Sequence, residues 1–289
     1  MLEGLGSEPI PVFHPKNITP SQIEGFPAFK EWKKTLKDSL EQQDRNKDHM
    51  FHADPYRVLS ITVQSVDRFG SKLGFIKLKA EIKAKKLNDQ GEIKQLPGIC
   101  FLRGGSVAVL MILRPKDSRD ERWVVMTEQP RIPAGSLTFL EIPAGMIDDK
   151  DDFSGAAAVE IEEETGFKIP STELIDMTEL ALRNAEETNL ESAMYPSPGG
   201  CDEFIKLFLW EKDLDRQEIE DVRGVLTGER HQGEMIKLRI CAYEDVWREG
   251  ARDAKTLAAW ALYEGLNRSG VLQREIKERK VAATRMIPV

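Results

Sequence analysis

The sequence contains few of the side chains that form disulfides or bind zinc. Its cysteines are Cys100, Cys201 and Cys241, which are odd in number, far apart and without a C-x-x-C pair. This pattern argues against a disulfide framework and predicts a reducing compartment. The four histidines show none of the spacings of zinc ligands, either with the cysteines or with one another. A structural zinc site is therefore not expected.

Long apolar runs and a basic excess are also absent. The longest apolar run, Val107 to Leu113, has seven residues, whereas about 20 are needed to cross a bilayer. We therefore expect no membrane span. Because 49 acids outnumber 41 bases, binding of nucleic acid over a basic surface is not expected either. The N-terminus shows neither an apolar signal segment nor an Arg-rich amphipathic stretch. This favours a cytoplasmic protein, with an organelle as the alternative if a presequence has been removed.

The chain has the composition of a globular protein and a very uneven distribution of acids. Hydrophobic residues make up 40% and charged residues 31% of its 289 residues, and its net charge is −8. Between Glu141 and Phe167 there are nine acids and one base, so this 27-residue segment carries the whole imbalance. Such a local excess of negative charge indicates a site that holds cations.

Hydrophobic periodicity predicts two modules, an N-terminal one over residues 1–100 and a second one over residues 101–289. The first 20 residues contain four prolines and are expected to form an extended arm. Residues 28–40 have the apolar spacing of a helix, and residues 58–66 and 76–82 have that of strands. These segments predict a small α+β unit.

The second module alternates strand and helix patterns around a long buried strand. The helix expected over residues 154–165 has Ser154 as its N-cap and Gly166 as its stop. Strands and one further long helix complete the pattern, with the strands at 107–113, 123–127, 137–142, 204–210 and 235–241 and the helix at 254–266. The fold class is therefore α/β.

Glutamates cluster at the end of the helix predicted over residues 154–165. Glu160, Glu163 and Glu164 share one helix face, because side chains three and four residues apart are neighbours. They also lie at the negative end of the helix dipole, which disfavours anions. A solvated acidic face is one interpretation. The other is a divalent cation, and clustered carboxylates without sulfur or imidazole favour Mg²⁺, with Mn²⁺ as a substitute.

The spacing around this helix resembles the Nudix box. The matching positions are Gly145, Asp151, Glu160, Ile161, Glu163, Glu164, Gly166 and Phe167. Two positions depart from the family pattern: Asp151 stands for the usual glutamate, and Val159 stands for the usual arginine, which helps to orient the glutamates in the family.

The resemblance extends over most of the chain to the plant ADP-sugar diphosphatases, in the ADP-ribose pyrophosphatase branch of Nudix hydrolases. The segments that carry it are 75–80, 97–99, 107–110, 127–129, 196–203 and 233–234. It implies a Nudix α/β/α sandwich behind an N-terminal sheet domain that contributes to dimerisation and covers the substrate. It also implies a homodimer and hydrolysis of a nucleoside diphosphate linked to a sugar.

The resemblance further implies roles for the acidic residues. Glu160 and Glu164 would be metal ligands, together with the carbonyl of Ala144, and Glu163 would ligate the metal or support catalysis. Glu234 would be the general base on the loop at residues 228–233. The alternatives are Glu229 as the base, or an ordinary strand-edge role for Glu234.

Three residues are expected at the substrate on the same basis. Arg131 would bind phosphate, for which the planar guanidinium is suited, unless it is an ordinary surface arginine. Arg103 is a second candidate of this kind. Glu203, in the segment Pro-Gly-Gly-Cys-Asp-Glu, would reach the metal or the ribose.

The function expected is Mg²⁺-dependent hydrolysis of ADP-sugars such as ADP-glucose or ADP-ribose to AMP and a sugar phosphate. One alternative is a broader nucleoside-diphosphate-sugar or dinucleotide pyrophosphatase. The other is a nucleotide-sugar-binding protein that has the fold without catalysis, which Val159 alone supports.

Overall fold

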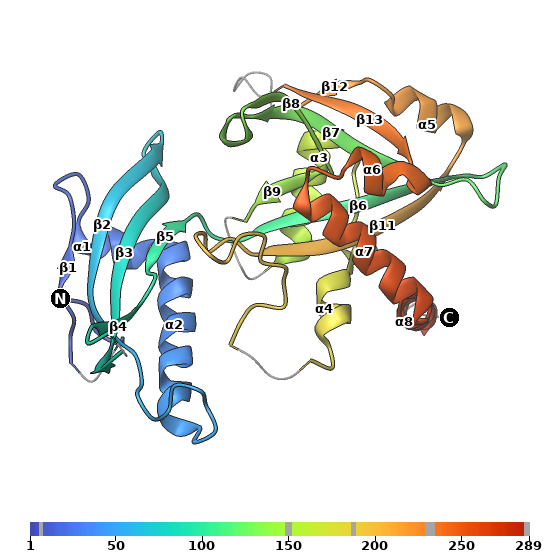
Figure 1. Cartoon of the computed structure of the whole chain (residues 1–289). Helices are drawn as coiled ribbons and strands as arrows, with labels where there is room; N and C mark the ends of the chain where they lie inside the picture. The colour runs from blue at the N-terminus through green and yellow to red at the C-terminus, as the bar shows by residue number, and fades with distance from the viewer. Residues whose placement is uncertain (6–7, 89, 148–151, 186–188, 229–234, 286–289) are drawn as a thin grey trace. The chain divides into compact units, whose positions relative to one another are not determined.

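The computed structural model describes residues 1–5, 8–88, 90–147, 152–185, 189–228 and 235–285, with the backbone alone for 282–285 (Figure 1). The chain forms two compact units. The first contains Met1–Gly105, Glu187–Glu191 and Ser197–Phe204, and the second contains Ser106–Glu186, Ser192–Pro196 and Ile205–Val289. Two segments that follow residue 101 in the sequence are therefore grouped with the N-terminal unit.

The first unit is a five-stranded sheet with two helices. Its strands run in the order β1-β2-β3-β4, and β5 also pairs with β3. Their bounds are β1 Val12–Phe13, β2 Arg57–Phe69, β3 Lys72–Leu87, β4 Ile93–Leu96 and β5 Ile99–Leu102. In β3 the apolar side chains of Ile76, Leu78 and Ala80 are buried, while the lysines between them lie on the other face. This alternation is the half-exposed strand pattern of the sequence.

Helices α1 (Pro20–Gly25) and α2 (Pro27–Arg45) belong to the same unit. The predicted apolar stripe of α2 packs into the sheet core through Phe29, Trp32 and Leu36. The N-terminal arm contributes buried residues of its own, and β1 pairs in parallel with β2. The arm is therefore part of this core.

The second unit is built on an eight-stranded sheet. Its order is β10-β11-β6-β7-β13-β12, with β8 added on β7 and β9 on β6. The bounds are β6 Ser106–Pro115, β7 Trp123–Arg131, β8 Ser136–Glu141, β9 Ala144–Met146, β10 Ile175–Asp176, β11 Ile205–Leu214, β12 Leu226–Thr227 and β13 Ile236–Ala242. Only the β6 and β11 pair is parallel among these described strands.

Helices cover both faces of this sheet (Figure 1). They are α3 Phe153–Thr165, α4 Met177–Leu182, α5 Arg216–Val222, α6 Val246–Glu249, α7 Ala254–Arg268 and α8 Val271–Arg285. Along β6, the alternate residues Ala108, Leu110 and Ile112 share a core with α4 and α7. Their neighbours Val107, Val109 and Met111 share the opposite core with α3 and α5. A strand buried on both faces accounts for the continuous apolar run and confirms the α/β/α sandwich.

The start of α3 differs from the prediction. Asp152, and not Ser154, is the N-cap, and its carboxylate accepts a hydrogen bond from the Gly155 N–H at 2.8 Å. Gly166 ends the helix at a φ of 77°, as predicted, because glycine adopts this left-handed conformation without steric cost. Within the described residues, no helix is both long and apolar enough to span a membrane.

Candidate active site

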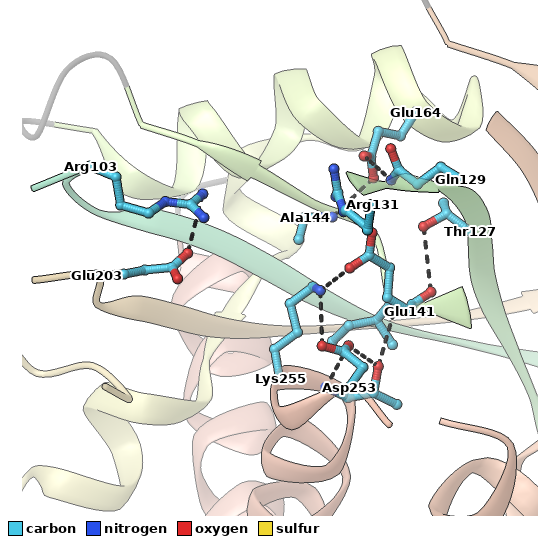
Figure 2. A network of polar contacts seen from close by, with 12 residues as sticks. Arg103, Thr127, Gln129, Arg131, Glu141, Ala144, Glu164, Glu203, Asp253 and Lys255 are labelled. Carbon is cyan, nitrogen blue, oxygen red and sulfur yellow. Dashed lines mark hydrogen bonds and ion pairs between the residues drawn. The ribbon is translucent and has the colours of Figure 1, made fainter. Parts of the chain in front are cut away.

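The acidic end of α3 faces β9 and β7 of the second unit, and Glu164 is buried there with 4% exposure. Its carboxylate accepts two hydrogen bonds, one from Gln129 Nε2 at 3.0 Å and one from the Ala144 N–H at 2.9 Å (Figure 2). Each oxygen therefore has a donor. These contacts fix Glu164 against Gln129 on β7 and Ala144 on β9, and the sequence resemblance places a backbone ligand at Ala144.

Glu160, one turn earlier on α3, lies against the backbone of Gly145. A Cβ atom added at Gly145 would come within 1.8 Å of the Glu160 carboxyl carbon and 1.9 Å of Oε2. Any side chain at residue 145 would therefore displace this carboxylate. The glycine of the motif is needed for this close approach and not for an unusual φ, since its φ is not positive. The structure thus brings Glu160, Glu164, Ala144 and Gly145 together.

The electrostatic state of Glu164 reflects its surroundings. Burial, together with the negative charges of Glu141 and Glu160, raises the pKa of this carboxyl to about 8 against the opposing hydrogen bonds from Gln129 and Ala144. Three carboxylates near one another in a water-poor site favour either a proton or a cation.

These residues fit a hard divalent cation. Two carboxylates and a backbone carbonyl are oxygen donors of the kind Mg²⁺ prefers, and a cation would offset the repulsion that raises the pKa of Glu164. In the described part of the chain, no three His, Cys, Asp or Glu side chains are already arranged as a metal cluster. The predicted ligands Glu160 and Glu164 are instead held by Gly145, Gln129 and Ala144, which preorganise them.

Two other motif positions on α3 face outward, whereas Ile161 is buried in the core. Glu163 is exposed, and Val159 is 56% exposed. Glu162 is exposed as well and forms an ion pair with Lys168 at 3.2 Å. Of the three glutamates predicted to share a face, Glu164 is thus the buried one, Glu160 is half-buried and Glu163 lies nearest to solvent.

Arg131, predicted to bind phosphate, is tied to a buried acid. Its Nη2 lies 2.7 Å from Oε1 of Glu141, whose side chain is 2% exposed, while the Arg131 side chain is 39% exposed. The second oxygen of Glu141 contacts Nζ of Lys255 (Figure 2). Lys255 also lies 3.0 Å from Asp253. Arg131 is therefore the outermost member of a chain of alternating charges.

This network fastens the start of α7 to the segment that carries Ala144. Asp253 is the N-cap of α7 and accepts hydrogen bonds from the N–H and the hydroxyl of Thr256. The Thr256 hydroxyl in turn accepts from the Ile142 N–H at 3.0 Å. Sequence reasoning missed Gln129, Glu141 and Lys255. An Asp before a helix signals a cap, but no local pattern shows that the following lysine points inward.

Arg103 and Glu203 lie in the first unit and contact each other. Arg103 Nη2 is 3.3 Å from a Glu203 oxygen, and the buried Nε of Arg103 has no hydrogen-bond partner among the described residues. Asp202, which precedes Glu203 in the sequence, accepts hydrogen bonds from the N–H groups of Arg103 at 2.7 Å and of Gly104 at 3.2 Å. The predicted bases Glu234 and Glu229, and the motif residue Asp151, lie outside the described residues.

Comparisons with known proteins identify relatives of this chain. The chain is 40% identical over 216 residues to "Nudix hydrolase 14, chloroplastic" of Arabidopsis thaliana, which covers 74% of this chain and 65% of that protein. It is 31% identical over 129 residues to an ADP-ribose pyrophosphatase of Bacillus subtilis, covering 42% and 57%. It is also 31% identical over 175 residues to a GDP-mannose pyrophosphatase of Cronobacter sakazakii, covering 58% and 77%.

The chain thus spans less than two thirds of the length of the Arabidopsis and Bacillus relatives. The NUDIX domain profile matches residues 103–260. This range contains every strand of the eight-stranded sheet and ends within α7. Glu160, which lies against Gly145, and the buried Glu164 occupy glutamate positions of the family motif. Because the profile also matches residues 103–260, the chain belongs to the NUDIX family.

Proposed function

We propose that this protein hydrolyses the diphosphate of ADP-sugars, giving AMP and a sugar phosphate, with Mg²⁺ as cofactor and Mn²⁺ as a substitute. The observation that carries the proposal is the pair Glu160 and Glu164, held on Gly145 and Ala144 at the end of α3. The name of the Arabidopsis relative supports the hydrolase class, and the name of the Bacillus relative supports the ADP moiety.

Glu160, Glu164 and the Ala144 carbonyl would hold the metal, with Glu163 as a further ligand or as support for catalysis. A bound Mg²⁺ would neutralise the diphosphate and lower the pKa of a water molecule. In the reaction one P–O bond of the diphosphate bridge breaks, and the water oxygen bonds to the phosphorus that loses the bridging oxygen. We assign the proton of that water to Glu234, with Glu229 as the alternative base.

Arg131 would bind the diphosphate, because its half-exposed guanidinium lies at the edge of the site and has several donors. Arg103 would be a second phosphate contact, and Glu203 would reach the ribose or the metal. Their ion pair with each other supports a joint role. We also propose a division at about residue 100, with an N-terminal domain that serves in homodimerisation and substrate cover.

A nucleotide sugar and a second copy of the chain are thus the proposed partners, without nucleic acid or membrane. The compartment proposed from the sequence is the cytoplasm. The word "chloroplastic" in the name of the Arabidopsis relative supports the organellar alternative.

Two other functions have some support. The name of the Cronobacter relative favours a broader nucleoside-diphosphate-sugar pyrophosphatase. Val159, which replaces the usual arginine, is consistent with a protein that binds nucleotide sugars without hydrolysing them. Against this alternative, each proposed ligand position has its carboxylate and Gly145 leaves room for Glu160.

A substrate panel tests the proposal. ADP-glucose, ADP-ribose, GDP-mannose and a dinucleotide are each incubated with the protein and Mg²⁺, and the products are separated by chromatography. We expect AMP and sugar phosphate from the ADP-sugars at the highest kcat/KM. Equal rates on GDP-mannose would favour the broader enzyme, and tight binding without products at any metal concentration would favour the binding protein. Repeating the reaction in ¹⁸O-labelled water identifies the phosphorus attacked.

Replacing the two candidate bases separates them. Glu234→Gln should lower kcat by about 100-fold or more with little change in KM, as expected of a proton acceptor. If Glu229→Gln gives this result and Glu234→Gln does not, Glu229 is the base.

A further inference from the structure

Glu141 is a buried acid shared by two cations of unequal exposure. Its side chain is 2% exposed, that of Lys255 is 12% exposed, and that of Arg131 is 39% exposed. A buried carboxylate needs a positive partner, because removal from water disfavours its charge strongly. Lys255 is the inner of the two partners, so Glu141 does not depend on Arg131 alone for neutralisation.

The two contacts differ in geometry. Lys255 Nζ donates a hydrogen bond to Oε2 of Glu141. Arg131 Nη2 lies 2.7 Å from Oε1, yet Oε1 accepts no hydrogen bond from any residue that the structure describes. The N–H bonds of Arg131 are therefore not aimed at Glu141. Charge attraction holds the guanidinium near the acid while its donors point elsewhere.

Lys255 is itself held from two sides. Its Nζ also donates to Asp253 at 3.0 Å, and Asp253 is fixed by the N–H and hydroxyl of Thr256 at the start of α7. The ammonium therefore cannot leave Oε2 of Glu141 without also breaking a contact at the helix cap. The ammonium is thus held in place on the Oε2 side of the Glu141 carboxylate.

An arginine beside a free carboxylate forms a two-point pair, with two parallel N–H bonds to the two oxygens. Such a pair at Glu141 would use two of the five N–H donors of Arg131 and turn that edge of the guanidinium away from a phosphate. We propose that Lys255 is a positioning residue that occupies one oxygen of Glu141, prevents this two-point pair and keeps the donors of Arg131 available to the substrate diphosphate. The inference rests on the proposed function, which assigns the diphosphate to Arg131.

A double-mutant cycle between Lys255 and Glu141 tests the inference. Lys255→Met removes the ammonium, frees Oε2 and lets Arg131 turn onto Glu141. It should raise KM for ADP-ribose about tenfold while kcat changes by less than about twofold, because phosphate binding is lost in both ground and transition states. In the Glu141→Gln background no carboxylate remains to capture Arg131, so the same substitution should change KM by less than about twofold.

Two further variants separate positioning from a general structural role. Lys255→Arg retains a cation at the cap and should restore KM to within about threefold of the wild type. Lys212→Met is the matched control, because Lys212 is a lysine of the same unit that is 44% exposed and paired with Glu173 on the surface; it should leave KM unchanged. Thermal unfolding of each variant shows that the proteins compared are folded.

Lys255→Met leaves Glu141 and Asp253 buried without their cation, and this can prevent folding. In that case Lys255→Ala, which also frees Oε2 and leaves space for water beside the two acids, is used in both backgrounds with the same expectations. Equal increases in KM in the two backgrounds, or an unchanged KM for Lys255→Met in the wild-type background, would overturn the inference.

Equilibrium binding keeps the test independent of turnover. The wild type, Lys255→Met, Glu141→Gln and the double variant are titrated with ADP-ribose by calorimetry without metal. Lys255→Met should weaken binding about tenfold only where Glu141 is present. If the wild type binds but does not hydrolyse ADP-sugars, the proposed function fails while this cycle still decides the role of Lys255. If the wild type binds no ADP-sugar, both proposals are wrong.

Discussion

At the scale of single residues, Glu164 combines two properties that conflict without a cation. It is almost completely buried, and it lies near Glu141 and Glu160, which also carry negative charge. Its two hydrogen bonds from Gln129 and Ala144 hold its position but do not neutralise it. The fold thus fixes the position of the Glu164 carboxylate, whereas its negative charge must be neutralised by a metal ion or a proton.

Glu164→Gln should abolish turnover and leave the fold intact. The amide removes a metal ligand but still accepts the Ala144 N–H bond, and its NH₂ group can donate to Gln129 if that side chain turns its amide over. Thermal unfolding without metal should show an equal or higher Tm, since a repulsive charge is removed. Glu162→Gln, on the exposed face of the same helix, is the control and should retain activity. Near-normal turnover of Glu164→Gln with Mg²⁺ would refute the ligand assignment.

The pH dependence of the metal-free protein follows from the same carboxyl. Its folded pKa of about 8 lies above the ordinary value of 4.5, so the folded state retains a proton that the unfolded chain has lost in this interval. The stabilisation is complete below about pH 4.5 and is lost as the pH rises through about 8. We expect the free energy of unfolding, measured by urea titration, to fall over this interval in the wild type. A profile of the same slope in Glu164→Gln would contradict the explanation.

Val159 is the motif residue whose chemistry departs most from the family. It is 56% exposed on α3, so an arginine can be accommodated there, and it would lie four residues before Glu163. Such a helix pair contributes only about 0.2–0.5 kcal/mol. We therefore expect Val159→Arg to lower the half-saturating Mg²⁺ concentration by about twofold without changing kcat. The measurement is a metal titration at saturating ADP-sugar. A change in kcat at saturating metal would show that the residue acts on the reaction itself.

At the scale of elements, the site is a junction between α3, β9 and the start of α7. The spacing of the motif predicted that Glu160 and Glu164 share a face, because helix geometry alone determines this. The motif spacing could not predict that Gln129 on β7 donates a hydrogen bond to Glu164, or that Lys255 donates one to Glu141. Those contacts join segments that are far apart in the sequence, and they depend on strand register and helix docking.

The contact between α3 and β9 can be broken by one methyl group. Gly145→Ala places a Cβ within 1.8 Å of the Glu160 carboxyl carbon, so the ligand must move. A misplacement of about 1 Å can cost about 100-fold in rate, and we expect a loss of this size in kcat/KM. Gly265→Ala on α7 is the control, because nothing lies within 4 Å of its added Cβ. Activity of Gly145→Ala near that of the control would mean that Glu160 does not need this position.

At the scale of the whole molecule, the sequence predicted the central strands and helices α2, α3 and α7, but it did not predict helices α4, α5 and α8 or the grouping of segments. The apolar run in β6 predicted a buried strand, and the structure confirms it, with a core on each face of the strand. Residues 197–204 belong by contacts to the first unit, although in the sequence they lie between two segments of the second unit. Short polar segments of this kind carry no periodicity from which their packing partners could be inferred.

The central proposed activity of this protein is the metal-dependent cleavage of a diphosphate at the acidic end of α3. The most direct test is a titration of Mg²⁺ into metal-free protein with ADP-ribose, in which AMP and ribose phosphate are measured separately. We predict that both products are absent without metal, appear in equal amounts as Mg²⁺ is added, and cease to form when a chelator is added. Product formation that is independent of divalent metal, or no products at any Mg²⁺ or Mn²⁺ concentration, would contradict the account.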